Sequence, residues 1–281
     1  MKHRFSKLLS LAVIFSLALS VFAFSAADSY AAAQKPKYIA HRGWSTKAPE
    51  NSRPALRLAA KNKNFYGVEF DIWESTAEPD SADPLLLVMH DENIRRMCGV
   101  SKNVRRITRA NRTKYKIKSG SNIKHYRNVQ IPTVEMALNA IWDNSNGAIP
   151  VIELKHRLSN RALGYLFDLI GDHKVAIISF EYSAVTDAVK MAKKRGVSKN
   201  VQTMYLPGSL SSGQRVSMAK KLKKAGINAV SLKYTYVSRT AVNTFHKYGI
   251  EVCTWTLPNK KTADKYVKMG VDYITANGAV Y

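Results

Sequence analysis

The chain contains 281 residues, of which 46% are hydrophobic, so it can bury one sizeable core, and barrels of about 250 residues often form single domains. Its two cysteines are too few for a disulfide-based scaffold, and neither lies in a spacing typical of a zinc site. The formal net charge of +24 does not specify a fold, but it predicts attraction to polyanions such as anionic lipid head groups and phosphate-rich polymers.

The first 33 residues have the layout of an export signal. Lys2, Arg4 and Lys7 precede an apolar run over residues 8–24, and small residues follow at 31–33. This order is typical of a cleaved signal peptide. We therefore expect a secreted protein, extracellular or associated with the cell wall, whose mature domain spans residues 34–281. The alternative is an uncleaved membrane anchor, because the apolar run is close to the shortest length that spans a bilayer.

From residue 37 onward, short apolar runs alternate with amphipathic stretches. The runs predict strands at 37–40, 67–73, 149–154, 175–180, 201–206, 229–232, 252–256 and 273–275. The amphipathic stretches predict helices at 51–61, 133–142, 162–170, 183–194, 215–224, 239–247 and 261–269. This alternation indicates an α/β protein with a parallel sheet, and eight strands fit a closed (β/α)8 TIM barrel. A doubly wound open sheet is the alternative, but no glycine-rich phosphate loop follows the first strand.

Two segments interrupt the alternation. The apolar run 85–89 follows the second strand without an intervening helix, so it cannot be a parallel neighbour of that strand, and we interpret it as a hairpin-like return. Residues 94–130 then form a basic insertion after the His-Asp motif, with no acidic residue between Arg95 and Arg127. The insertion is expected next to the site. It either holds an anionic substrate or surface, or is a solvated basic loop.

Histidines end two of the predicted strands. His41, Arg42 and Gly43 close the first strand, and His90 and Asp91 end the run 85–89. The carboxyl ends of barrel strands share one face, where active sites are built. An arginine offers planar, bidentate donors to phosphate oxygens, and a histidine can transfer protons near neutral pH. The pattern therefore favours chemistry on a phosphate ester.

Paired charges lie two residues apart on two further strands. Glu69 and Asp71 share one face of the second strand, and Glu153 and Lys155 share one face of the third. Two carboxylates inside a barrel repel each other and are costly to bury unless a cation lies between them. An oxygen-only ligand set indicates a hard divalent cation, Ca²⁺ or Mg²⁺. Lys155 can neutralise a phosphate.

The ordered motifs resemble those of the glycerophosphodiester phosphodiesterase family. The matching pattern is His-Arg-Gly at 41–43, Pro-Glu-Asn at 49–51, Glu-x-Asp at 69–71, His-Asp at 90–91 and Glu-x-Lys at 153–155. A weaker likeness continues at 253–256 and 270–275. The resemblance covers nearly all of residues 34–281. It implies a TIM-barrel hydrolase that splits glycerophosphodiesters into sn-glycerol 3-phosphate and an alcohol.

The resemblance also implies a role for each matching residue. The implied catalytic acid and base are His41 and His90. The implied ligands of the divalent cation are Glu69, Asp71 and Glu153. The implied phosphate-binding cations are Arg42 and Lys155. Glu50 matches a further acidic position at the site, and Trp255 matches an aromatic residue that shapes the glycerol end of the pocket.

Departures from the family pattern leave the substrate open. The segment 77–84 is longer and acidic, Met97 rather than threonine follows Arg96, and Ala276 rather than aspartate follows Thr275. One alternative is a sphingomyelinase-D-like phospholipase, since that group shares a related barrel and the pair of histidines. Another is a non-catalytic binder of a phosphate-rich wall polymer.

The expected partners follow from the charge and the motifs. They are a small-molecule phosphodiester and, through the basic insertion, an anionic wall polymer or a membrane surface. No specific nucleic-acid binding is predicted, because the sequence lacks basic motifs interleaved with aromatic residues. The sequence indicates no oligomeric state.

Overall fold

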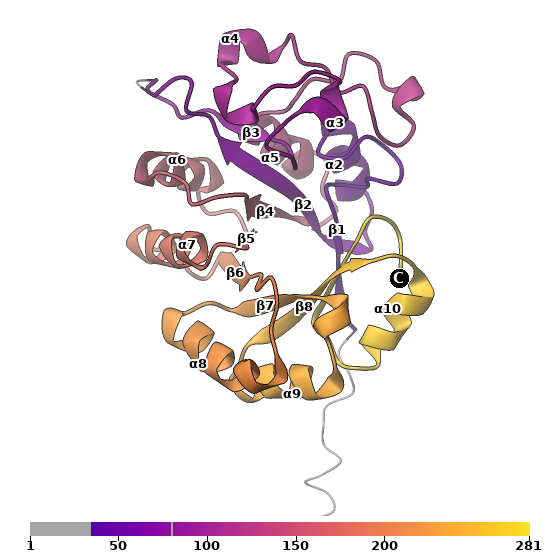
Figure 1. Cartoon of the computed structure of the whole chain (residues 1–281), viewed down its shortest axis with the longest axis vertical. Coiled ribbons are helices and arrows are strands. Elements are labelled where there is room, and N and C mark those ends of the chain that lie inside the picture. The colour runs from indigo at the N-terminus through magenta and orange to yellow at the C-terminus, as the bar shows by residue number, and fades with distance from the viewer. Residues whose placement is uncertain (1–34, 80) are drawn as a thin grey trace, which may run out of the picture. The chain divides into compact units, whose positions relative to one another are not determined.

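Eight parallel strands close into a barrel in the computed structural model, which describes residues 35–79 and 81–281 (Figure 1). They are β1 (Lys37–Ala40), β2 (Phe65–Glu74), β4 (Ile149–Leu154), β5 (Val175–Ser179), β6 (Val201–Tyr205), β7 (Ala229–Lys233), β8 (Glu251–Leu257) and β9 (Tyr273–Ala276). Each strand pairs with the next in this order, and β9 pairs with β1 to close the sheet. The predicted TIM barrel is thus confirmed. The export signal predicted for residues 1–33 lies outside the described residues.

Helices follow the strands and cover the outside of the barrel (Figure 1). They are α2 (Arg53–Ala60), α5 (Val134–Trp142), α6 (Asn160–Ile170), α7 (Tyr182–Lys194), α8 (Arg215–Ala225), α9 (Arg239–Lys247) and α10 (Lys260–Val267). Most begin at a residue whose side chain accepts a hydrogen bond from a free N–H of the first turn, such as Ser52 and Thr133. Among the described residues, no helix has the length and apolar character needed to cross a membrane.

The alternation of side chains along β2 determines what the barrel encloses. Val68, Phe70 and Ile72 are fully buried in the core between the strands and the covering helices. The intervening Glu69 and Asp71 are each 1% exposed and therefore project from the opposite, inner face of the strand. The period of two thus brings two carboxylates into the barrel, as the sequence predicted.

The strand β3 (Leu86–Val88) runs antiparallel to the carboxyl end of β2, which confirms the expected return. The basic segment 94–130 connects β3 to α5. The sequence predicts an elaborated loop or a small insertion here, without helices, and the segment contains four short ones: α3 (Arg95–Cys98), η1 (Val104–Arg106), α4 (Arg109–Arg112) and η2 (Ile123–His125). Apolar residues such as Ile94, Met97 and Ile117 form a small core of their own with β3. The segment is therefore a packed layer beside the barrel.

Both cysteines act as packing residues. Cys98 lies in the small core of the basic segment, and Cys253 lies inside the barrel. Each is about 1% exposed and carries a free thiol.

Candidate active site

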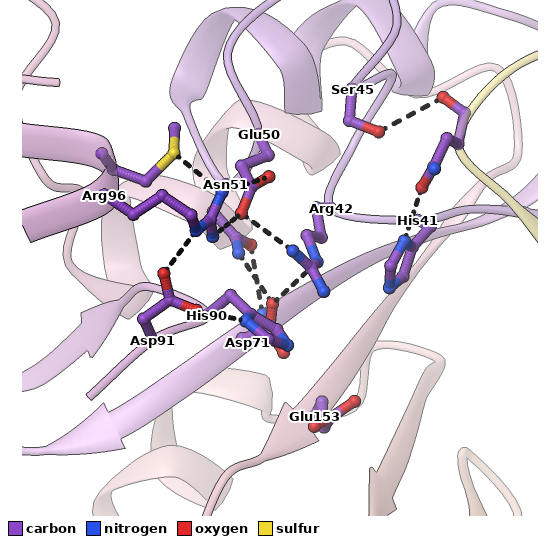
Figure 2. A network of polar contacts seen from close by, with 12 residues as sticks. His41, Arg42, Ser45, Glu50, Asn51, Asp71, His90, Asp91, Arg96 and Glu153 are labelled. Carbon is purple, nitrogen blue, oxygen red and sulfur yellow. Dashed lines mark hydrogen bonds and ion pairs between the residues drawn. The ribbon is translucent and has the colours of Figure 1, made fainter. Parts of the chain in front are cut away.

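The predicted site residues meet at the carboxyl ends of the strands. A cavity of about 110 Å³ opens there, and six of the residues line it: His41, Arg42, Glu69, His90, Glu153 and Trp255. Asp71 and Lys155 lie within 3.8 Å of members of this set. Glu50 lines an adjoining groove that shares His41 and Arg42 with the cavity. The structure therefore brings all of them into one neighbourhood, and Figure 2 shows most of them together.

A tight turn after β1 positions His41 and Arg42. Arg42 and Gly43 both have a positive φ, 56° and 74°. A Cβ at Gly43 would lie 2.6 Å from the carbonyl carbon of Ala55, so only glycine fits against α2. The turn aims the backbone N–H of Arg42 at the Glu69 carboxylate, with 2.7 Å between nitrogen and oxygen. The His-Arg-Gly motif is thus anchored directly to β2.

Three carboxylates form a buried cluster at the floor of the cavity. Glu69, Asp71 and Glu153 each offer an oxygen that lies within 4.8 Å of the others. Burial, together with the charges of Asp71 and Glu153, raises the pKa of Glu69 well above its ordinary value. Burial and the charge of Asp71 raise the pKa of Glu153 to about 7. Without further positive charge, the cluster resists full ionisation.

The cluster fits a divalent cation. One oxygen of Glu69, Oε1, is buried and accepts no hydrogen bond from the described residues. A buried carboxylate oxygen with no donor is rare unless an ion or a water contacts it. The donor set contains only carboxylates and no sulfur, which suits a hard cation. These three residues are therefore suited to hold a divalent metal ion.

Two cations flank the carboxylates. The ammonium of Lys155 lies 2.8 Å from Glu153 and 3.3 Å from Asp71. The guanidinium of Arg42 lies 3.8 Å from Asp71 and donates to Glu50 at 2.9 Å. Burial alone would lower the pKa of Lys155, but the carboxylates outweigh it and raise the pKa, so this amine stays charged.

The two histidines are held by different partners. The Nδ1 atom of His41 lies 2.6 Å from the amide oxygen of Asn277, so Nδ1 carries the proton and Nε2 is left as an acceptor. Burial, followed by the charge of Arg42, lowers the pKa of His41 to about 4, which keeps the ring neutral at pH 7. The Nδ1 atom of His90 lies 2.7 Å from the Asp91 carboxylate. Both side chains therefore have fixed ring orientations.

Asn51 and Arg96 complete the network around these residues, although their roles were not assigned from the sequence. Asn51 donates to the Asp71 carboxylate at 2.7 Å and accepts from its backbone N–H at 3.2 Å (Figure 2). Arg96 donates to Asp91 at 2.6 Å and to both oxygens of Glu50. In the sequence, the Pro-Glu-Asn motif was the feature that could have indicated a role for Asn51 at the site. For Arg96 the signal was its match to the arginine that follows the His-Asp motif in the family pattern, which gave no role for it.

Arg96 links the basic segment to both sides of the site. Burial alone would raise the pKa of Glu50, but the contacts with Arg96 and Arg42 outweigh it, and the pKa is lowered. The same guanidinium holds the carboxylate that orients His90. Arg96 is thus a positioning residue for His90 and Arg42.

Replacing Arg96 by methionine is expected to lower kcat by up to about a hundredfold, because misplacing a reacting group by 1 Å can cost that much. The measurement is kcat and KM for a phosphodiester substrate, with Arg95→Met as the control on the neighbouring exposed arginine. Arg96→Lys should recover only part of the loss, since lysine cannot make the forked contact. Equal kcat values for the two methionine variants would exclude a positioning role.

The far wall of the cavity is apolar. Ile178, Phe180, Leu206 and Trp255 line it, opposite the charged residues. The Trp255 indole N–H donates to the carbonyl oxygen of Ser231 at 3.2 Å, and its ring meets Phe180 edge to face. The cavity thus has one charged side and one aromatic side, which suits an anion that carries a carbon chain.

Known proteins show the same sequence pattern and fold. The profile of the Glycerophosphoryl diester phosphodiesterase family matches residues 41–278. The Bacillus subtilis protein YhdW, named as a candidate glycerophosphodiester phosphodiesterase, is 28% identical over 242 residues, which are 85% of this chain and 93% of that protein. The glycerophosphodiester phosphodiesterase of Caldanaerobacter subterraneus is 25% identical, with the same shares covered.

A solved structure has the same fold. It is a phosphodiesterase of Oleispira antarctica in complex with the product sn-glycerol 3-phosphate. The two structures superpose with a TM-score of 0.71 over 86% of this chain and 93% of that chain, at 20% sequence identity.

Proposed function

The chain belongs to the glycerophosphoryl diester phosphodiesterase family, since the family profile covers residues 41–278, and from this premise we propose that it hydrolyses glycerophosphodiesters. The products are sn-glycerol 3-phosphate and an alcohol. The observation that carries the proposal is the meeting of three buried carboxylates, two cations and two histidines in and directly beside one cavity. Two relatives that are named for this activity, described above, support the proposal.

The charged side of the cavity fits a phosphodiester anion. Arg42 and Lys155 supply fixed positive charge beside it, and neither has to reorganise during the reaction. A divalent cation, Ca²⁺ or Mg²⁺, held by Glu69, Asp71 and Glu153 would polarise the phosphoryl oxygens and offset developing negative charge. Asn51 holds the Asp71 carboxylate in place for this role.

The two histidines supply proton transfer. One takes a proton from the attacking hydroxyl, which belongs either to water or to the neighbouring glycerol hydroxyl of the substrate. The other gives a proton to the leaving alkoxide. The neutral ring of His41 has its Nε2 free, and Asp91 fixes the ring of His90 with its Nε2 free as well. Each ring can therefore exchange a proton with a reacting oxygen through its Nε2 atom.

The proposal extends to where the protein works. The charged, apolar and small segments of residues 1–33 support export and cleavage near Gln34. The basic segment 94–130 supports contact with an anionic wall polymer or membrane surface. Amino-terminal sequencing of protein recovered from the culture medium tests the first point, and a start at Met1 would contradict it.

The activity is tested with residues 34–281 and glycerophosphocholine. We expect release of glycerol 3-phosphate that EDTA abolishes and that added Ca²⁺ or Mg²⁺ restores. Phosphorus NMR of the same reaction distinguishes direct hydrolysis from a cyclic phosphate that appears first. No release with any cation, but turnover of lysophosphatidylcholine or sphingomyelin, would favour the phospholipase alternative. Binding of a phosphate-rich polymer without any turnover would favour the non-catalytic alternative.

A further inference from the structure

A second pocket lies outside the barrel, beside α2 and α5. Its volume is about 380 Å³, and it shares no lining residue with the cavity at the barrel mouth or the adjoining groove. It is lined by Arg53, Pro54 and Arg57 of α2, by Arg112 of α4, by Arg127, Asn128, Val129, Gln130 and Pro132, and by Met136 of α5. The pocket therefore lies where the basic segment packs against the barrel helices.

The charges of this pocket are all positive. Four arginines line it, and no aspartate or glutamate does. Arg53 and Arg57 stand four residues apart on one face of α2, a spacing at which like charges destabilise a helix. Within the described part of the chain, the side chains of Arg53, Arg57 and Arg127 make no hydrogen bond or ion pair.

Arginines elsewhere in the described structure contrast with this group. At the barrel mouth and on the outer helices several are paired with carboxylates: Arg42 with Glu50, Arg96 with Glu50 and Asp91, Arg157 with Asp187, and Arg195 with Asp168. Five of the eleven described arginines outside the pocket have such a counter-charge, whereas none of the four that line the pocket does.

Arg112 is the buried member of the set. Its side chain is held by one hydrogen bond, from Nη1 to the carbonyl oxygen of Ile131 at 2.5 Å, and the residue is 8% exposed. Burying a cation is costly, and burial lowers the pKa of this guanidinium by more than the nearby charge of Glu135, which forms no ion pair with it, raises the pKa. An anion in the pocket would offset that cost. The remaining N–H groups of Arg112 are available for it, because one hydrogen bond uses only one of five donors.

We propose that this pocket is a second, non-catalytic binding site for phosphate groups. Guanidinium groups recognise phosphate oxygens through paired N–H donors, and several of them suit a dianion or two neighbouring phosphate groups better than a single negative charge. Asn128, held by Lys116 at 2.7 Å, and Gln130 add polar groups to the wall. The phosphate can belong to a free phosphomonoester or to a polymer of phosphodiesters.

The test is calorimetric titration with inorganic phosphate, glycerol 3-phosphate, tripolyphosphate and a short poly(glycerol phosphate). EDTA is present, and the ionic strength is about 0.15 M so that distant charges are screened. The variant Arg57→Gln with Arg127→Gln should bind at least one probe roughly tenfold more weakly, since each loses a charge-assisted hydrogen bond. The matched control, Lys220→Gln with Lys224→Gln on α8, removes the same charge from exposed positions.

Two further measurements separate the pocket from the barrel mouth. Lys155→Met should leave the binding that depends on Arg57 and Arg127 unchanged, and the pocket variant should hydrolyse glycerophosphocholine at the wild-type rate. Tight binding of glycerol 3-phosphate identifies a free phosphomonoester as the occupant, and binding of the polymer alone identifies a chain. Equal weakening in the pocket variant and the lysine control would overturn the proposal, as would binding that only Lys155→Met removes.

Discussion

Replacing either His41 or His90 by alanine is expected to lower kcat/KM for glycerophosphocholine by about 10²–10⁴-fold, the usual contribution of a general acid or base. Both rings line the cavity, and each is fixed through Nδ1 by a neighbouring residue, so both losses should be catalytic rather than structural. His125→Ala is the control, because this histidine lies on an exposed 3₁₀ helix of the basic segment. Thermal unfolding of all three variants checks that each remains folded.

A substrate with an activated leaving group then assigns the two roles. A p-nitrophenyl phosphodiester releases p-nitrophenolate, a stable anion that needs no proton to leave. The variant that lacks the general acid should therefore regain most of its rate on this substrate. The variant that lacks the general base should stay slow with both substrates. With glycerophosphocholine, general acid-base catalysis contributes at least about a hundredfold. Activity within about threefold of wild type on that substrate for either alanine variant would remove that histidine from the mechanism.

Much of the fold was predictable because its elements have regular periods. All eight barrel strands were identified to within two residues of their observed ends, since short apolar runs alternate with amphipathic helices. The orientation of Glu69 and Asp71 also followed from the strand period of two. A β-strand has only two faces, and the apolar residues Val68, Phe70 and Ile72, which alternate with these acids, had to occupy the outer one.

The basic segment could not be predicted in the same way. Its helices α3 and α4 have four residues each, too short for a helical period to appear in the sequence. Its small core draws apolar residues from β3 and from positions as far apart as Met97 and Val129. These contacts depend on how distant parts of the chain fold together, which local helix and strand propensities do not encode.

The same limit applies to the site. The motifs predicted which residues meet, but not that Arg96 holds Asp91 and Glu50 together. The family pattern has an arginine at the place of Arg96, but only the position of α3 beside the Pro-Glu-Asn loop shows which groups this arginine contacts. The Arg57 and Arg127 pocket also combines residues 70 positions apart, so no local pattern in the sequence indicated it.

The metal site leads to the second large effect. Replacing Glu69 by glutamine is expected to lower activity by at least about a hundredfold, because the cation loses one of its three carboxylates. In the presence of EDTA the same variant should be more stable than wild type, by about 1 kcal/mol or more, which is about 2–4 °C in Tm at this chain length. The amide keeps an acceptor for the N–H of Arg42 and removes one negative charge from the buried cluster.

The pH dependence of the metal-free protein has a defined sign. The pKa of Glu153 is raised to about 7 from an ordinary value of 4.5, and that of Glu69 is raised well above it. The folded state therefore holds protons that the unfolded state releases, so the stability that these two groups contribute is fully present below about pH 4.5 and is lost as the pH rises through 7. In EDTA, wild type should lose more stability than Glu69→Gln between pH 5 and pH 8.

Metal binding reverses the ranking of the two proteins. A cation at a hundred times its Kd stabilises wild type by about 2.7 kcal/mol, whereas Glu69→Gln should gain much less. Glu251→Gln is the matched control, since this acidic residue lies on β8 beside Tyr273 and Gln202, outside the carboxylate cluster. A Ca²⁺ or Mg²⁺ shift in Tm that is equal in wild type and Glu69→Gln would place the cation elsewhere. An EDTA-treated Glu69→Gln less stable than wild type would mean that the three carboxylates are compensated by the protein alone.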